Sequence, residues 1–344
     1  MFNLLTNFYF KTKVKRLLYL LMLFFLTDHT FAQTTAGSLA PKPVYRDPVF
    51  DGAADPTLIW NQTKKKWYMF YTNRRATDTT DFGVSWVHGT DIGIAESTDG
   101  AKWKYLETAK INYKPDSGYT YWAPEIIEHK GLYHMYLTYV PGVFADWHHP
   151  RNIIHLTSKN LLDWKFESTL HLANDKVIDP CVLQLPNGTW RMWYNNESDK
   201  KSIYYADSPD LYNWKDGSKA IYDQRGEGPK TFKWLDRYWM VTDVWEGLAI
   251  YSSKDLKTWT RQEGGNLLAG AGKGVDDGVK GGHCDVRVSA NSRAYLYYFV
   301  HPGINTKGSR YQKQRSSIQV VELKYQNGKI TCDRDMPTYV DLKY

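Results

Sequence analysis

Two short segments of the chain place an aspartate and a proline at the start of an apolar run: "AADPTLIW" contains Asp55 and "VIDPCVL" contains Asp179. Three further segments offer ionisable side chains at matching places, namely Glu125 in "WAPEII", Glu227 in "GEGPKTFKW" and His283 before "CDVRV". Carboxylates that meet in a partly desolvated pocket raise one another's pKa, so that one is protonated while another is ionised. Such a pair can protonate a leaving oxygen and activate a water molecule, which is the chemistry that hydrolysis of a glycosidic bond requires.

A simpler explanation exists for any one of these residues, because Asp-Pro and Gly-Pro are common in turns and an aspartate can cap a bend. The pattern, however, recurs five times. Because gathered like charges cost stability, five ionisable side chains at equivalent positions favour acid–base work over turn formation alone.

The elements that must hold these residues come from an internal repeat. Four turns, "STDGAKW", "SKNLLDW", "SPDLYNW" and "SKDLKTW", each end in a tryptophan, and each follows an aromatic segment such as "KWYMFYTN". Units of four short strands, starting roughly 50 to 70 residues apart, are typical of propeller blades. We therefore predict an all-β, single-domain, five-bladed β-propeller. A β-sandwich is the structural rival, but it gives no reason for five matching units.

The repeat also predicts where the remaining segments belong. The fifth unit lacks the turn, so "SSIQVVELKY" from Ser316 and "KITCD" from Lys329 should supply its outer strands, with residues 42–50 helping to close the ring. The first strand of every blade lines the central channel, so the ionisable residues at the starts of these strands should converge at one end of the axis. Four tryptophans of the turns are expected to serve blade packing, namely Trp103, Trp164, Trp214 and Trp259.

The N-terminal segment resembles a secretory signal peptide. Basic residues at positions 11–16 precede the apolar run 17–26, and polar and small residues follow up to Ala32. The apolar run of about ten residues is too short to cross a bilayer about 30 Å thick as a helix. We expect cleavage near Ala32, which removes residues 1–32, leaves the propeller domain at 33–344 without a membrane span, and makes the protein secreted or periplasmic.

Composition narrows the class of protein further. Aromatic residues make up 15% of the chain and crowd into short runs broken by Gly, Asn, Asp and Pro, as in β-proteins. No Lys/Arg block stands out beyond residues 64–66, so nucleic acid is a poor candidate partner. Three cysteines, Cys181, Cys284 and Cys332, cannot all pair within the chain, so this is not a disulfide scaffold.

Taken in order along the units, "ADPTLI", "WAPEII", "IDPCVL" and "GEGPKTFKW" resemble the motifs of glycoside hydrolase family 43 and its relatives, five-bladed propeller enzymes that cut arabinose- and xylose-containing glycans. The resemblance covers about residues 45–300. It implies that Asp55 is the general base, that Asp179 orients the acid and raises its pKa, and that Glu227 is the general acid. It also implies inversion of the anomeric configuration.

The same resemblance implies that His283 sits on the axis near a calcium ion or a water cluster, and that Arg287 steadies the acid or the substrate. Many relatives carry aspartate where this chain has Glu125, a change that reshapes the pocket or only lengthens a contact. Cys284 is an unusual neighbour for His283. One histidine plus waters is a thin ligand set for calcium, so a metal at His283 is optional and no cofactor is required.

A sugar ring has apolar C–H faces and hydroxyl groups, so its pocket usually combines a stacking aromatic with polar side chains. The long first-unit insertion "NRRATDTTDFGVSWVHGTDIG" should wall one end of the channel, which favours a pocket and exo-cleavage. Loop aromatics Trp147 and Trp245 are further candidates. We expect substrate contacts from six residues, namely Trp122, Glu125, Trp86, Arg74, His283 and Arg287.

Three functions are carried forward from the sequence. The leading one is a secreted, inverting, exo-acting glycosidase of the α-L-arabinofuranosidase or β-D-xylosidase type that acts on plant or algal polysaccharide. Another is a 3,6-anhydro-L-galactosidase or galactosidase of a sister propeller family. The third is a non-catalytic glycan-binding propeller, which would keep the aromatics but need not keep all three carboxylates.

Overall fold

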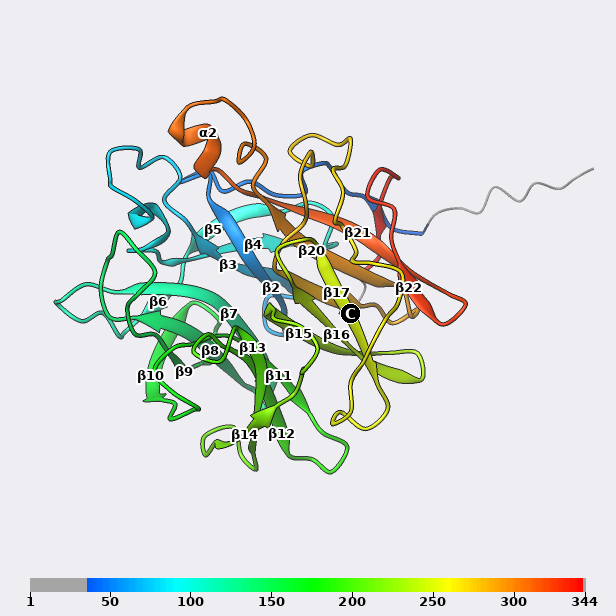
Figure 1. The fold of residues 1–344 in the computed structure, drawn as a ribbon, viewed down its shortest axis with the longest axis horizontal. Coiled ribbons are helices and arrows are strands. Elements are labelled where there is room, and N and C mark those ends of the chain that lie inside the picture. The colour runs from blue at the N-terminus through cyan, green and yellow to red at the C-terminus, as the bar shows by residue number, and fades with distance from the viewer. Residues whose placement is uncertain (1–35, 343–344) are drawn as a thin grey trace, which may run out of the picture. The chain divides into compact units, whose positions relative to one another are not determined.

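The computed structural model describes residues 36–342, and the expected signal peptide at residues 1–32 lies outside them. Residues 37–342 form an all-β, five-bladed propeller (Figure 1), which confirms the predicted fold. Each blade is an antiparallel sheet of four consecutive strands, of which the first lies innermost. Within residues 36–342, no helix has the length and apolar character needed to cross a membrane.

The blades follow the chain in order. Blade 1 contains β2 (Ala53–Asn61), β3 (Lys66–Asn73), β4 (Ile92–Ser97) and β5 (Lys104–Thr108). Blade 2 contains β7 (Thr120–His129), β8 (Leu132–Val140), β9 (Asn152–Ser158) and β10 (Asp163–Thr169), and β6 (Lys110–Ile111) pairs in parallel with β10. Blade 3 contains β11 (Val177–Gln184), β12 (Trp190–Asn196), β13 (Ser202–Ser208) and β14 (Lys215–Lys219).

Blade 4 contains β15 (Glu227–Trp234), β16 (Arg237–Asp243), β17 (Leu248–Ser253) and β18 (Thr260–Arg261). Blade 5 contains β19 (Cys284–Val288), β20 (Ala294–Val300), β21 (Ser317–Gln326) and β22 (Lys329–Thr331), which confirms the predicted outer strands. Outside the blades lie β1 (Ser38–Leu39), its partner β23 (Tyr339–Val340), a 3-10 helix at Ser85–Val87 and the short helix α2 (Arg310–Gln314).

The four inner strands that contain a proline are bulged at the residue before it. Asp55, Ala123, Asp179 and Gly228 all have a positive φ, between 45° and 59°, and the strand register shifts at each. Only glycine adopts this conformation without steric cost, so the surrounding structure must hold the other three. A bulge re-aims the side chain beside it, and bulges often lie next to active sites.

The repeated turns form as the sequence indicates. The Oγ atom of the first serine accepts a hydrogen bond of 2.9 Å from the N–H group three residues on in all four turns, at Ser97, Ser158, Ser208 and Ser253. The tryptophan that ends each turn packs against a hydrophobic cluster of buried residues. These side chains serve blade packing, as expected.

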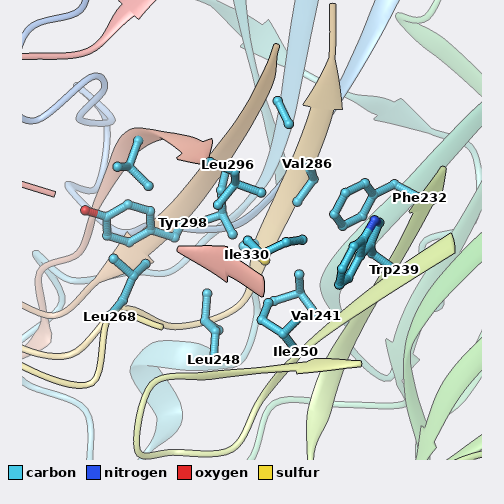
Figure 2. Close-up of a cluster of buried hydrophobic side chains, with 14 of the residues drawn as sticks. Phe232, Trp239, Val241, Leu248, Ile250, Leu268, Val286, Leu296, Tyr298 and Ile330 are labelled. Carbon is cyan, nitrogen blue, oxygen red and sulfur yellow. The ribbon is translucent and has the colours of Figure 1, made fainter. Parts of the chain in front are cut away.

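The hydrophobic core lies between adjacent blades. Figure 2 shows the cluster in which Trp239, Val241 and Ile250 of blade 4 meet Leu296 and Ile330 of blade 5. All five side chains are almost completely buried. Burial of apolar area at about 25 cal/mol per Å² makes such interfaces the main source of ring stability.

Segments that flank the blades close the ring between blades 1 and 5. Tyr45 pairs with Ile318 of β21, and Gly52 forms a parallel bridge with Ser316. This confirms the prediction that residues 42–50 help to close the ring. The indole N–H group of Trp67 in β3 donates a 2.8 Å hydrogen bond to the carbonyl of Leu342, so both flanking segments contribute to the seam.

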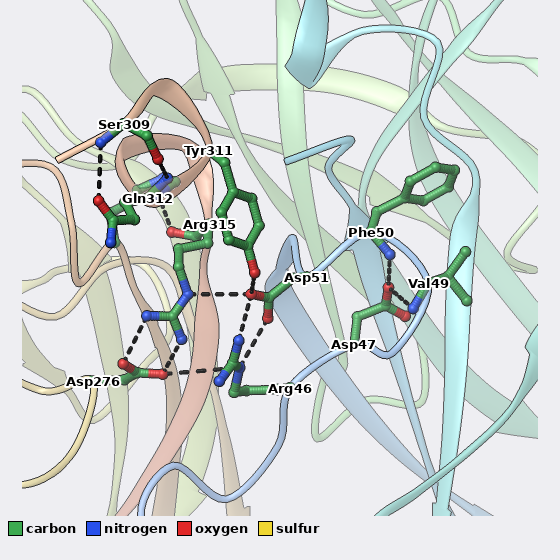
Figure 3. Close-up of polar contacts among 11 residues, drawn as sticks. Arg46, Asp47, Val49, Phe50, Asp51, Asp276, Ser309, Tyr311, Gln312 and Arg315 are labelled. Carbon is green, nitrogen blue, oxygen red and sulfur yellow. Dashed lines mark hydrogen bonds and ion pairs between the residues drawn. The ribbon is translucent and has the colours of Figure 1, made fainter. Parts of the chain in front are cut away.

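A network of charged side chains ties this seam to the connection between β18 and β19 (Figure 3). Arg315 contacts Asp51 Oδ2 through Nε at 3.1 Å and Asp276 Oδ1 through Nη1 at 2.9 Å. Asp51 also accepts hydrogen bonds from Arg46 and from the hydroxyl group of Tyr311. The segments that border the fifth blade are therefore held by partly buried ion pairs.

Candidate active site

A cavity of about 680 Å³ lies where the bulged ends of the inner strands meet the surrounding loops. Its size falls within the usual range for small-molecule sites. Trp147 and Trp245 line it, whereas Glu125 and Arg287 are not among its lining residues. Seven of the predicted site residues line it, namely Asp55, Asp179, Glu227, Arg74, Trp86, Trp122 and His283.

Asp55 lies at the bulge of β2 and is 6% exposed. Both of its carboxylate oxygens accept hydrogen bonds of 3.2 Å from Nη2 of Arg74, and Nδ1 of His283 lies 3.7 Å from Oδ1. Burial raises the pKa of this carboxyl group, but the charges of Arg74 and His283 outweigh burial and hold the pKa below its ordinary value. Asp55 is therefore ionised at neutral pH, as a general base must be.

Asp179 occupies the equivalent bulge of β11. Its N–H group donates to Thr138 Oγ1 at 3.0 Å, and its Oδ2 accepts from the N–H group of Gly228 at 3.0 Å. Burial, and after it the charge of Asp55, raise the pKa of Asp179 to about 7. A Cβ atom on Gly228 would lie 2.5 Å from the ring of His283, so glycine is what lets β15 approach this ring.

Glu227 is the first residue of β15, and a quarter of its side chain is exposed. Its Oε1 accepts a 3.1 Å hydrogen bond from the indole N–H group of Trp245, and Nζ of Lys201 lies 3.7 Å from Oε2. Burial, followed by the charges of Asp179 and Asp243, raises the pKa of Glu227 to about 8. Glu227 therefore keeps its proton at neutral pH while it remains accessible from the cavity.

Aromatic and basic side chains form the cavity walls. Nη1 of Arg74 lies 2.7 Å from Nε2 of His301, and the ring of Trp86 meets the His301 ring edge-on at a centroid distance of 5.9 Å. The indole N–H group of Trp122 donates to the carbonyl of Val87 at 2.6 Å. Trp147 is 51% exposed and lies 5.9 Å from Trp122, so it offers an accessible ring face for a sugar.

Several lining residues were missed by the sequence reasoning: Arg151, Glu197, Lys201, Asp243 and His301. Glu197, Asp243 and His301 lie at, or one residue after, the end of the second strand of their blade, as the predicted Arg74 does. Polar residues at the ends of these second strands were the signal that could have found them. Arg151, from the loop between β8 and β9, and Lys201, four residues after Glu197 in the same turn, pair with Glu197, and the sequence carries no comparable signal for them.

Glu125 and Arg287 lie instead in a second polar group on the inner strands, which we call the axial cluster: Glu125, Lys230, Asp285 and Arg287. Nζ of Lys230 lies 2.8 Å from both Glu125 Oε2 and Asp285 Oδ1, and Nε of Arg287 lies 2.9 Å from Asp285 Oδ2. Glu125 stands two residues beyond the bulge at Ala123, not at it. The structure therefore differs from the expectation that Glu125 meets the other carboxylates.

The axial cluster joins all five inner strands. Glu125 of β7 accepts hydrogen bonds from the hydroxyl group of Thr57 in β2 and from the N–H group of Val182 in β11, both at 3.2 Å. Asp285 of β19 accepts a 2.7 Å hydrogen bond from the N–H group of Leu58. With Lys230 of β15, the cluster satisfies its buried charges by bridging the blades.

The donor groups near His283 do not fit calcium, which takes six to eight oxygen ligands. Among residues 36–342, no group of three or more His, Cys, Asp or Glu side chains is arranged to hold a metal ion. The ammonium group of Lys230 supplies the positive charge between Glu125 and Asp285. All three cysteine thiols are free, and Cys181 accepts a hydrogen bond from the N–H group of Thr231.

Comparison with known proteins finds a family profile that matches the chain. The profile of Glycosyl hydrolases family 43 matches residues 45–244. A search of curated protein sequences finds no match to the chain.

Solved structures share the fold at low sequence identity. A thermostable family-43 glycoside hydrolase superposes with a TM-score of 0.66 and 17% identity, over 87% of this chain and 100% of that one. A family 43 β-1,3-galactosidase with galactodeoxynojirimycin gives 0.63 and 14%, over 85% and 97%. A family 43 β-xylosidase/α-arabinofuranosidase from a compost microbial metagenome, in complex with xylotriose and in a calcium-free form, gives 0.61 and 16%, over 86% and 97%.

Proposed function

The chain belongs to family 43 of the glycosyl hydrolases, and we propose that it is an inverting, exo-acting glycosidase of the α-L-arabinofuranosidase or β-D-xylosidase type. Family membership makes the reaction the hydrolysis of an O-glycosyl bond. One observation supports the assignment of roles: Asp55 and Glu227 line the same cavity, and their surroundings shift their pKa values in opposite directions. Two carboxyl groups in one site whose pKa values are shifted in opposite directions are the expected base and acid.

In the proposed mechanism, Asp55 accepts a proton from a water molecule as the water oxygen bonds to the anomeric carbon. Glu227 gives its proton to the glycosidic oxygen as the bond between that oxygen and the anomeric carbon breaks. The products are the free sugar with inverted configuration and the alcohol of the leaving group. Asp55 ends protonated and Glu227 ionised, and proton exchange with solvent restores both.

Asp179 is proposed to keep the acid protonated. It lies on β11, the inner strand of the preceding blade, and its Oδ2 accepts a hydrogen bond from the N–H group of Gly228, the residue after Glu227. A carboxylate so close disfavours ionisation of Glu227. Loss of this residue should therefore shift the pH dependence of the acid as well as lower the rate.

The exo mode rests on the loops around the cavity. Trp86 comes from the long insertion of blade 1, Trp147 from the loop after β8, and Ile304 from the segment before α2. Side chains from three separate loops that line one cavity favour a pocket for a chain end. A terminal arabinofuranose or xylose of plant or algal polysaccharide is the proposed glycone.

A galactoside is the second candidate for the glycone. The structure of the β-1,3-galactosidase resembles this chain about as well as that of the β-xylosidase/α-arabinofuranosidase does. The alternatives 3,6-anhydro-L-galactosidase and glycan-binding propeller are not favoured by a specific observation.

The test is sugar release from aryl α-L-arabinofuranoside, β-D-xyloside and galactosides and from agar oligosaccharides, with wild type beside Glu227→Gln. Release of one sugar that the variant loses on poor leaving groups identifies both the glycone and the acid. NMR of the first product anomer distinguishes inversion from retention. Binding of glycans without release by wild type would contradict the proposed enzyme and favour a binding propeller.

Secretion or periplasmic location is also a proposal. It is supported by the basic residues at 11–16 and the apolar run at 17–26, and N-terminal sequencing of the mature protein tests it. A mature chain that begins close after Ala32 is expected. A chain that retains residues 1–32 would contradict it.

A further inference from the structure

Trp245 is held unusually firmly beside Glu227. It follows β16 with a φ of 61°, a left-handed conformation that is uncommon for a bulky residue and that is found where surrounding contacts impose it. Its N–H group donates to Asp243 Oδ1 at 2.8 Å, and its carbonyl accepts a hydrogen bond from Lys280. Its indole ring has the ammonium group of Lys201 5.1 Å from its centroid and the guanidinium group of Arg225 at 4.9 Å.

Lys201 is held in place as well. It lies in the turn between β12 and β13 with a φ of 57°, and its Nζ lies 2.9 Å from Glu197 Oε1. The other oxygen of Glu197 lies 2.9 Å from Nε of Arg151. This chain of ion pairs leaves Nζ of Lys201 3.7 Å from Glu227 Oε2.

The two contacts act differently on the two oxygens of Glu227. An indole N–H group can only donate, and the carbonyl oxygen of a neutral carboxyl group is its better acceptor, so we assign the carbonyl oxygen to Oε1, which accepts from Trp245, and the proton to Oε2. The distance of 3.7 Å from Lys201 to Oε2 is too long for a hydrogen bond, so the Oε2–H group stays available to a substrate. The charge of Lys201 nevertheless favours the carboxylate form.

We propose that Trp245 and Lys201 are positioning residues for the acid: Trp245 reserves Oε1 as an acceptor so that Oε2 delivers the proton, and Lys201 stabilises the carboxylate that remains. This inference rests on the proposed function, because it needs Glu227 as proton donor. It adds two residues, which face Glu227 from blades 3 and 4, to the three carboxyl groups of Asp55, Asp179 and Glu227.

The charges around Glu227 explain why such a pair is needed. Asp179 of β11 and Asp243 of β16 disfavour ionisation, whereas Lys201 and His283 favour it. The acid must keep its proton until the bond breaks and must then lose it. Asp179 and Asp243 serve the first requirement, and Lys201 stabilises the state that follows.

The experiment measures the titration of Glu227 directly. Carboxyl-labelled ¹³C-glutamate NMR, assigned with Glu227→Gln, is recorded against pH for wild type, Lys201→Met, Lys201→Arg and Trp245→Phe. We expect the midpoint to rise by about one pH unit in Lys201→Met, to return toward wild type in Lys201→Arg, and to rise in Trp245→Phe, because each contact favours the carboxylate. Lys257→Met, which removes an exposed lysine from the turn after β17, is the matched control and should not move it.

Kinetics of the same variants provide the second readout. Trp245→Phe should lower kcat on substrates with poor leaving groups about 10- to 100-fold and change KM and the rate on activated aryl glycosides little, as expected for impaired acid catalysis. In the pH profile of kcat/KM, the alkaline limb should move to higher pH in Lys201→Met and return toward its wild-type position in Lys201→Arg. Melting temperatures near that of wild type show that the variants are folded.

Two outcomes would overturn the inference. A Glu227 midpoint that stays at its wild-type value in Lys201→Met and Trp245→Phe removes it, even if the enzyme cleaves glycosides. Equal losses on good and poor leaving groups in Trp245→Phe assign that residue to substrate binding instead. Failure of the proposed function looks different: Glu227→Gln would then retain activity on poor leaving groups, while the NMR titrations would still report the contacts.

Discussion

Two groups of carboxyl side chains lie on different inner strands of the propeller, and their charges are compensated differently. In the axial cluster, Glu125 and Asp285 each have a cationic nitrogen within 2.8 Å and also accept backbone N–H groups. In the cavity, Asp179 has no ion-pair partner within 4.0 Å among residues 36–342, and the nearest ammonium group to Glu227 is 3.7 Å away. The pKa of Asp285 is lowered despite its burial, by Arg287 and Lys230, whereas burial and neighbouring carboxylates raise that of Glu227.

The difference shows what distinguishes a structural charge from a reactive one. Buried charges are normally paired and hydrogen-bonded, and the axial cluster follows this rule. A carboxyl group that must hold a proton at neutral pH, as Glu227 does, cannot be paired so completely, because a cationic partner would keep it ionised. The bulges separate the two groups: Asp55 and Asp179 stand at bulges, while Glu125 and Lys230 lie two residues beyond theirs.

The largest effect should come from the cavity group. Asp55→Asn and Glu227→Gln should each lower kcat/KM about 10²- to 10⁴-fold, the usual contribution of a general base or acid. The urea midpoint of Glu227→Gln should not fall below that of wild type, because the amide keeps the volume of the side chain and Glu227 has no ammonium group closer than 3.7 Å. Initial rates and urea unfolding measure the two properties. A variant that loses stability instead of rate would place these residues with the axial cluster.

The reverse pattern is expected for the axial cluster. Lys230→Met leaves Glu125 and Asp285 buried without their ammonium partner and should lower the free energy of unfolding by about 3–5 kcal/mol. Urea unfolding followed by circular dichroism measures this. Adding Glu125→Gln to Lys230→Met should recover part of the loss, since one unpaired charge is removed. No loss in the single variant would contradict a structural role.

The pH dependence of activity and of stability should show a smaller difference between the cavity carboxylates and the axial cluster. Activity should fall on the alkaline side near pH 8, where Glu227 loses its proton, and on the acid side only below the ordinary pKa of an aspartate, where Asp55 gains one. For stability, a raised pKa favours the fold at pH values below the unfolded pKa, and this contribution is lost as the pH rises toward 8. Glu227→Gln should therefore flatten the decline in melting temperature between pH 5 and 8. An unchanged decline would assign it to other groups.

The smallest effect is expected from removal of divalent metal. Lys230 already supplies a cation between Glu125 and Asp285, and the residues around His283 do not form a calcium site. Dialysis against EDTA should therefore change neither the melting temperature nor kcat/KM. A loss of melting temperature or kcat/KM that only calcium restores would show that a metal ion binds near the propeller axis.

Much of this architecture could be predicted because the repeat is written in local signals. The Ser-Asp-Trp turns and the Asp-Pro motifs identify blades and place Asp55 and Asp179 at equivalent positions, and the structure has both at bulges. The position of Glu125 along the channel, two residues past the bulge at Ala123, could not be predicted, because it depends on contacts with neighbouring strands. Lys201 and Trp245 were also beyond reach as partners of Glu227, since their roles come from contacts between blades.

The seam between blades 1 and 5 affects the order in which activity and β-structure are lost on heating. The proposed site straddles this seam, with Asp55 and Arg74 on blade 1 and His283 and His301 at the edges of blade 5. Strand bridges, side-chain hydrogen bonds and the ion pairs of Asp51 hold it closed, whereas hairpins connect the strands within each blade. Partial parting of the ring there would separate Arg74 from His301 while blades 2 to 4 keep their cores. Catalytic inactivation should thus set in at a lower temperature than the loss of β-structure, and thermal tolerance of activity can be raised at the seam alone.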